Sequence, residues 1–149
     1  MVLESILAFL HVSAILGWIV FATSQAAICR GDWLNPTVVQ RLVRLDRILW
    51  IATVAVLLTG ILRIYLGAKG TAFYAGNLLL YAKVGLFLAV MALQVSPSRH
   101  YRAGADRLAH DTLPSEGEVR GARRQVMIAT HLVAVIPLPA AFLARGFGA

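Results

Sequence analysis

The sequence predicts an all-α integral membrane protein, a four-helix bundle of up-down-up-down topology with both termini outside. Its 149 residues are 59% hydrophobic and 14% charged, with a mean hydropathy of +0.75. That is too apolar for an ordinary soluble domain. The chain holds apolar runs long enough to cross a bilayer, which takes about 20 residues of helix. We therefore expect one domain over 1–149, with spans at about 3–28, 46–66, 76–95 and 124–145.

The first span carries no charge from Ile6 to Ile28. The residues before it lack the basic start of a cleavable signal peptide, so we expect the run to remain in the mature protein. Cys29, at the end of the span, is the only cysteine of the chain. A disulfide within the chain is therefore excluded, and Cys-x-x-Cys-His, the motif for covalent haem attachment, is missing.

The second span is predicted to begin outside the apolar layer. Asn35-Pro36 is a helix-start signal, with Asn as N-cap and Pro in the first turn. The residues up to 45 alternate apolar and arginine side chains, which is typical of a helix at headgroup level. Asp46 stands among three arginines, and we interpret it as one partner of an interfacial ion pair. A short loop at 67–70 follows.

The third and fourth spans flank the one long polar stretch of the chain. Ser96-Pro97 is expected to end the third span. Ser115-x-x-Glu118 fits a capping box, so the last helix should start before the membrane. Pro137 and Pro139 should kink or loosen its final third.

Lys and Arg side chains gather in the connections 29–45 and 96–123. This bias predicts that both connections are cytoplasmic, which places the termini and the 67–70 loop outside. The net charge of +7 does not follow one exposed face, so lipid headgroups explain it better than nucleic acid.

His11 is the first candidate for chemistry, because an ionisable side chain deep in a span is costly and is by default a hypothesis about function. His11, Trp18 and Gln25 recur every seven residues and so share one helical face. Small residues on that face leave room for a bulky planar group, and Trp18 could pack against its edge. The alternative is a His that hydrogen-bonds a neighbouring helix, with Trp18 as core filling.

His131 is the second candidate, because it lies near the middle of the last run and the first and fourth helices of such a bundle are neighbours. The two imidazoles could ligate one haem from opposite faces or serve separate sites at different depths. The uncertainty of the run ends, about 2 to 4 residues, leaves both arrangements open.

Haem suits these residues better than other metal cofactors. A closed zinc site wants four ligands, and no Cys, Asp or Glu in the membrane interior, away from the span ends, supplies the rest. A haem needs only two His ligands from the protein. Arg63 and Lys83, in the outer half of the membrane, could bind its propionates. The alternative for both is snorkelling to the headgroups.

These observations predict a membrane protein that binds non-covalent haem b, in one or two copies, and transfers electrons, with His11 and His131 as ligands and Trp18, Arg63 and Lys83 around the cofactor. We expect a quinone or a redox protein as partner and leave open whether the protein is an oxidoreductase enzyme or a homo-oligomer. A colourless transport or assembly subunit, with polar side chains lining a path, is the alternative. Hydrolase and nucleotide-driven motifs are missing.

Three stretches resemble an uncharacterised family of short four-span bacterial membrane proteins. They are Thr59-Gly60-Ile61-Leu62-Arg63-Ile64-Tyr65, Tyr81-Ala82-Lys83-Val84-Gly85-Leu86-Phe87, and the ending from Ile136-Pro137 to Ala144-Arg145-Gly146. The resemblance implies the four-span fold and a multi-pass protein of the bacterial inner membrane, without an activity.

A shorter pattern resembles the HemJ-type protoporphyrinogen oxidase family. It consists of His11, Trp18 seven residues later, and Ala82-Lys83 in the third span. That family binds haem b and uses a first-span His and a third-span Lys as its functional pair. The resemblance implies that His11 is an axial ligand and Lys83 a functional cation. The entry to the last span, Arg123-Arg124-Gln125-Val126, departs from the acidic and proline pattern of that family.

Overall fold

The computed structural model describes residues 2–67 and 69–147, and within these residues it is built from helices without any strand. Four long segments are apolar and long enough to cross a membrane. They are α1 (Val2–Ile28), α2 (Pro36–Leu66), α4 (Leu78–Arg107), and α5 (Glu116–Val135) continued by α6 (Pro137–Ala144). The predicted all-helical membrane bundle is thereby confirmed. Ala68, in the predicted 67–70 loop, lies outside the described residues.

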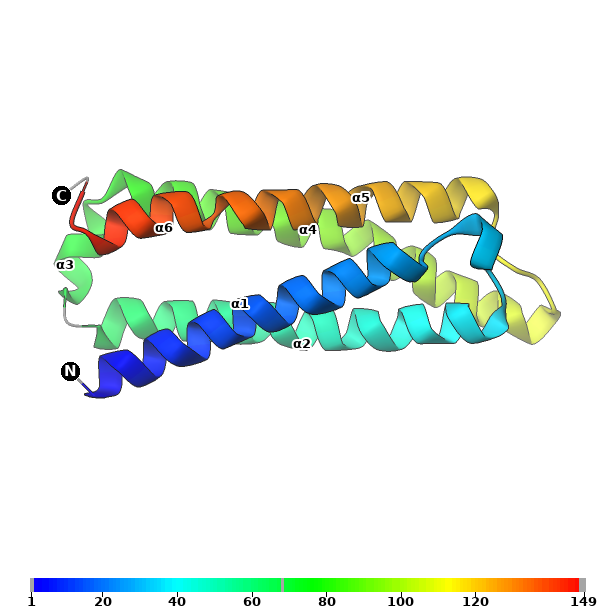
Figure 1. Ribbon diagram of the computed structural model, residues 1–149, viewed down its shortest axis with the longest axis horizontal. Helices are drawn as coiled ribbons and strands as arrows, with labels where there is room; N and C mark the ends of the chain where they lie inside the picture. The colour runs from blue at the N-terminus through cyan, green and yellow to red at the C-terminus, as the bar shows by residue number, and fades with distance from the viewer. Residues whose placement is uncertain (1, 68, 148–149) are drawn as a thin grey trace.

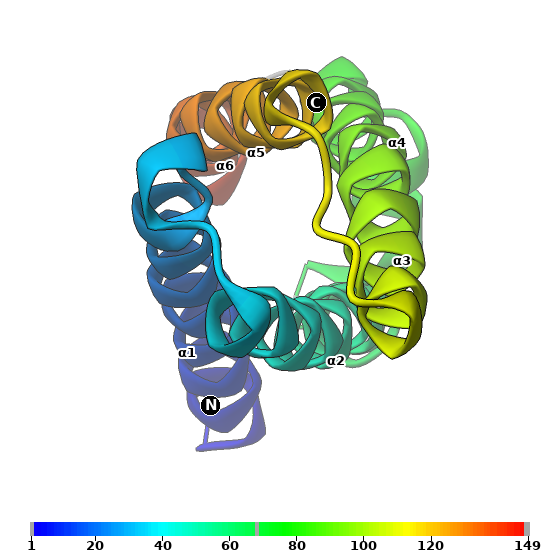
Figure 2. The ribbon, with the colours of Figure 1, turned by 90° about the vertical axis from the view of Figure 1, so that its right-hand side faces the viewer.

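The long helices form a closed ring in chain order, with α1 between α2 and α5 and α4 between α2 and α5 on the other side (Figure 2). Both chain ends lie at one end of the bundle, together with the short helix α3 (Gly70–Ala75) (Figure 1). The helical turns η1 (Gly31–Trp33) and η2 (Leu108–His110) lie at the opposite end. The chain therefore runs up, down, up and down.

The helix α1 is tilted relative to the other three. Its N-terminal half lies near α2 and diverges from α6, whereas its C-terminal half lies beside α5 (Figures 1 and 2). Side chains from the first half of α1 therefore meet α2 and α4 before they meet the last span.

Capping hydrogen bonds confirm the two predicted helix starts. The Asn35 side chain accepts from the backbone N–H of Val38, 3.0 Å away, with Pro36 in the first turn. Ser115 and Glu118 form the predicted capping box, in which the Glu118 carboxylate accepts from the Ser115 N–H at 2.8 Å. These caps satisfy backbone donors that a helix leaves open at its start.

The helix α4 does not end at Ser96-Pro97, contrary to the sequence prediction. Pro97 lies inside α4, which continues to Arg107. Pro97, Ser98, Tyr101 and Gly104 are all buried. The packing of this buried face offsets the one helical hydrogen bond that a proline removes.

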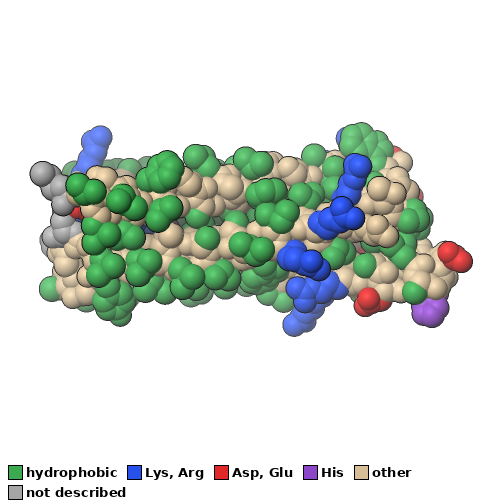
Figure 3. Space-filling view, turned by 90° about the horizontal axis from the view of Figure 1, so that it is seen from below, with side chains coloured by type: hydrophobic (Ala, Val, Ile, Leu, Met, Phe, Trp, Pro, Cys, Tyr) green, Lys and Arg blue, Asp and Glu red, His purple; other side chains and the backbone are tan. Residues whose placement is uncertain are grey.

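The last span is interrupted where the prolines predict. The helix α5 ends at Val135, Ile136 is a turn, and α6 begins at Pro137. The surface supports a membrane setting. A band of Lys and Arg side chains lies between a long apolar surface and the end of the bundle with most of the acidic side chains (Figure 3). We call the end of the bundle next to this band, which carries η1 and η2, the arginine-rich end.

Candidate functional site

The polar face predicted for α1 points into the bundle. His11, Trp18 and Gln25 are buried, with exposed fractions of 4%, 3% and 1%. Between them α1 presents Ala22, which is fully buried. Polar side chains in an apolar interior need partners, and the partners of this face come from α2 and α4.

The His11 imidazole is held by Thr59. Its Nδ1 lies 2.8 Å from the Thr59 Oγ1. The Thr59 hydroxyl donates its own proton to the backbone carbonyl of Ala55, 2.6 Å away, so its oxygen accepts from the ring. A neutral imidazole has one N–H. His11 therefore carries its proton on Nδ1, and Nε2 presents a lone pair.

The Nε2 lone pair faces Lys83. The Lys83 Nζ lies 3.5 Å from Nε2, which is long for a hydrogen bond. On the other side of the ring, a Cβ built on Gly60 would lie 3.3 Å from the His11 Cε1. The absence of a side chain at Gly60 thus provides the space in which the ring lies against α2.

Arg63 completes a basic cluster with His11 and Lys83. It lies one turn beyond Thr59 on α2 and interacts electrostatically with both of them. Arg63 and Lys83 are half-buried. The ion pairs found among the described residues lie at the arginine-rich end, and neither involves this cluster. Positive charge here has no carboxylate partner, which favours an acidic ligand.

Lys69, which the sequence places near the same end, is engaged elsewhere. Its ammonium group donates to the backbone carbonyls of Leu143 and Ala144, at 2.8 and 2.7 Å. A cation beside the last carbonyls of α6 stabilises the end of that helix. Lys69 is therefore a structural cap.

A second polar contact lies deeper in the core. The Trp18 indole N–H donates to the Thr53 Oγ1 at 3.0 Å, and the same hydroxyl contacts the Gln94 Oε1 at 2.9 Å. The Gln94 Nε2 is buried without a hydrogen-bond partner among the described residues. Sequence reasoning did not connect Thr53 or Gln94 with Trp18.

A third polar contact involves Asp46, whose predicted ion pair is wrong. Asp46 is 2% exposed and accepts a hydrogen bond of 2.6 Å from the Ser98 hydroxyl. It shares the inward face of α2 with Leu42, Leu49 and Thr53, while its arginine neighbours in the sequence, Arg44 and Arg47, are exposed. Helical spacing therefore separates the carboxylate from the arginines beside it in the sequence.

His131 lies in different surroundings from His11. It is exposed on the side of α5, and its Nδ1–H donates to the backbone carbonyl of Met127 at 2.6 Å. Its neighbours are apolar side chains of α5 and the arginines at the start of that helix. The buried face of α5 consists of other residues, Val119, Ala122, Val126, Ala129 and Val133. Joint ligation of one haem by His11 and His131 stays a prediction.

Four membrane-crossing segments define this chain as a multi-pass membrane protein, and the buried His11 with the half-buried Lys83 and Arg63 forms a basic cluster between α1, α2 and α4. Residues 3–148 match the family described as "Predicted membrane protein (DUF2214)", and the chain belongs to that family. No curated protein matches, and no solved structure matches. The similarity to the HemJ-type family remains a prediction.

Proposed function

We propose that this protein is a haem b-binding redox protein of the bacterial inner membrane, in which His11 is an axial ligand. The observation that carries the proposal is the hydrogen bond between Thr59 and His11. It holds the ring in the tautomer that keeps Nε2 available, as a hydrogen bond to the second nitrogen commonly does for metal-binding histidines. A bound haem would supply one-electron redox chemistry.

The residues around His11 suit a haem in charge. Haem carries two propionates, and the basic side chains Lys83 and Arg63 lie beside the imidazole without carboxylate partners. Gly60 leaves the ring space against α2. Lys83 stands where a metal would approach Nε2, so its flexible side chain has to turn away toward the propionates. Trp18, two turns from His11 and about 10 Å along the helix, would close the inner edge of the site.

His131 remains the proposed second ligand. Its Nδ1–H is bound to the Met127 carbonyl, which leaves Nε2 available by the same reasoning as for His11. The helix α1 diverges from α6 toward its N-terminus (Figure 1). One shared haem would need His11 and His131 close together across the bundle, whereas two separate haems would not. Haem counting therefore belongs in the first experiment.

The experiment is an absorption spectrum of the protein purified after expression with added haem precursor, together with the haem-to-protein ratio. We expect a Soret band that is lost in His11→Ala and shifted in His131→Ala. His110→Ala is the matched control, since His110 is exposed at the arginine-rich end, and it should leave the band unchanged. A colourless protein, or a band that persists when both His11 and His131 are replaced, would refute the proposal. A colourless protein would favour the transport or assembly alternative.

A second candidate is the oxidation of a porphyrinogen precursor. The contact of 3.5 Å between His11 and Lys83 favours it, because it joins the two residues that the HemJ-type resemblance names as functional. The chain should then restore growth of a strain without protoporphyrinogen oxidase, and Lys83→Met should fail to do so. Failure of the unchanged chain, expressed at normal level, would exclude this activity and leave haem binding to its own test.

A further inference from the structure

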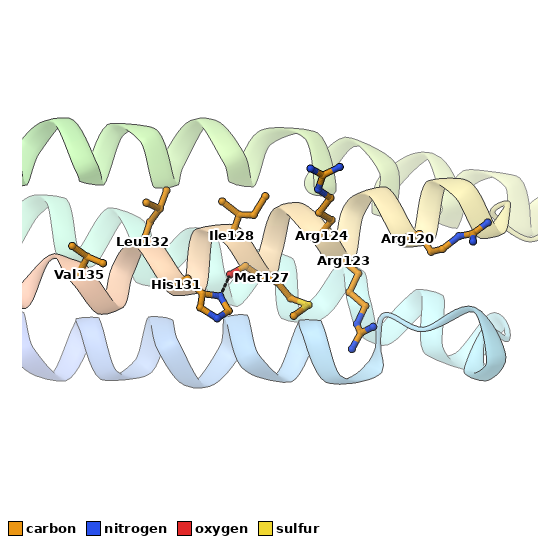
Figure 4. Close-up of a pocket in the computed structure, with 8 residues that line it drawn as sticks. All are labelled: Arg120, Arg123, Arg124, Met127, Ile128, His131, Leu132 and Val135. Carbon is orange, nitrogen blue, oxygen red and sulfur yellow. Dashed lines mark hydrogen bonds between the residues drawn. The ribbon is translucent and has the colours of Figure 1, made fainter.

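The outward surface of α5 carries a groove, and His131, the proposed second haem ligand, is one of the residues that line it. The groove has a volume of about 530 Å³. Along most of its length it is lined by Met127, Ile128, Leu132 and Val135, with His131 among them (Figure 4). These side chains lie on the apolar part of the last span, so the surrounding medium is lipid.

Three arginines lie at one end of this groove. They are Arg120, Arg123 and Arg124, and they extend in different directions around the start of α5 (Figure 4). Arg124 makes no hydrogen bond or ion pair with the described part of the chain. Arg120 has a loose, exposed pairing with Glu116 at 3.9 Å. Two of the three guanidinium groups are thus available to an external anion.

Arg123 differs from the other two, because it helps to build the groove. Its Nε donates to the backbone carbonyl of Ala26 at 3.2 Å. This bond ties the start of α5 to the end of α1, where a helix leaves carbonyls open. The arginine end of the groove is therefore fixed to the neighbouring helix.

The dimensions of the groove match one leaflet of a bilayer. Arg124 and Val135 are separated by about 16 Å along a helix, and half of the hydrocarbon layer is about 15 Å. A molecule with a negative head and a single-leaflet apolar tail would place its charge at the arginines and its tail along the apolar wall. Clusters of basic side chains beside a transmembrane helix are known to attract acidic lipid headgroups.

We propose that this groove binds an acidic phospholipid, with its phosphate at Arg120 and Arg124 and one acyl chain along Met127, Ile128 and Leu132. The site shares only His131 with the haem proposal, and the phosphate and acyl-chain contacts proposed here do not involve His131. Guanidinium groups suit a phosphate because their planar N–H donors bind its oxygens in pairs.

The test is native mass spectrometry of the full chain in detergent, titrated with phosphatidylglycerol, with phosphatidylcholine of the same acyl chains, and with inorganic phosphate. We expect tight binding of one phosphatidylglycerol, weaker binding of phosphatidylcholine, and no retained phosphate. Replacing Arg120 and Arg124 together by Gln should weaken phosphatidylglycerol binding roughly tenfold or more, since each surface arginine near an acidic headgroup has a sizeable effect.

The matched control is the pair Arg44→Gln and Arg47→Gln, which removes the same charge from exposed positions on α2. This control should change the affinity less than threefold. Ile128→Trp, which fills the groove, should also weaken binding, whereas Ile51→Trp on the exposed side of α2 should not. Equal losses in both arginine pairs would show general headgroup attraction and overturn the site. Equal binding of the two lipids, or retention of phosphate alone, would also overturn it.

Discussion

The tautomer of His11 is the premise of the haem proposal, and Thr59→Val tests it without any cofactor. Valine keeps the shape of threonine and removes the oxygen that accepts the Nδ1 proton at 2.8 Å. The Nδ1 N–H would then lose this acceptor, so the preference for the Nδ1–H tautomer would weaken, while the Lys83 ammonium would still face Nε2 as a donor. We therefore expect the population of the Nε2–H tautomer of His11 to rise.

The size of the shift follows from the energy of one hydrogen bond. A net contribution of about 1 to 1.5 kcal/mol corresponds to a change of roughly five- to tenfold in the tautomer ratio. Membrane proteins have shown smaller average values, about 0.6 kcal/mol, which would still give a change of roughly threefold. Either value is large enough to detect in the ring nitrogens of one histidine.

The assay is nitrogen-15 NMR of protein labelled at histidine, with the His11 signals assigned from their loss in His11→Ala. Thr130→Val is the matched control, because the Thr130 hydroxyl binds, among the residues that the structure describes, only the carbonyl of Val126 in its own helix, at 2.8 Å. An Nε2–H tautomer already dominant in the unchanged protein would refute the reasoning. An unchanged ratio in Thr59→Val would refute it as well.

Three further predictions concern the core and the connections. Thr53→Val should lower the free energy of unfolding by about 1 to 3 kcal/mol, because the buried Trp18 indole loses its acceptor. Unfolding in detergent measures this loss, which should be smaller in a Trp18→Phe background. Ser115→Ala should destabilise the start of α5 by about 1 kcal/mol, seen as faster hydrogen exchange in its first turn and not in that of α2. Burial raises the pKa of the Cys29 thiol, so less thiolate forms; maleimide labelling of the folded protein should stay slow from about pH 7 to about pH 9 and become fast after unfolding. Rapid labelling of the folded protein near neutral pH would contradict the burial of Cys29.

The sequence predicts the helices well because their signals are local. The uncharged runs, the Asn35-Pro36 start and the Ser115–Glu118 capping box each depend on a few neighbouring residues. Pro97 is the exception, since a local rule predicts a helix end and burial of the surrounding face overrides it. Local signals therefore locate the helices, and tertiary packing decides the remaining boundary.

The site was only partly predictable, because an uncharged apolar run does not reveal which of its faces is inward. On α1 the spacing of His11, Trp18 and Gln25 indicates the buried face correctly. On α5 the central position of His131 suggested an inward side chain, but small residues such as Ala122 and Ala129 mark the buried face, and His131 lies off it. The spacing of the alanines is the signal that could have placed His131.

The three polar contacts of the core differ in their charge. Thr53 and Gln94 at Trp18 are neutral, and Asp46 accepts from a serine and interacts with Arg102. The His11 cluster instead gathers two basic side chains around an imidazole with no acidic partner among the described residues. Such contacts fix how helices align in a membrane, but alignment requires no excess of one charge. The excess of positive charge at His11 supports an acidic ligand there. A haem would be such a ligand, because it carries two negative propionates and an iron that the free Nε2 could bind.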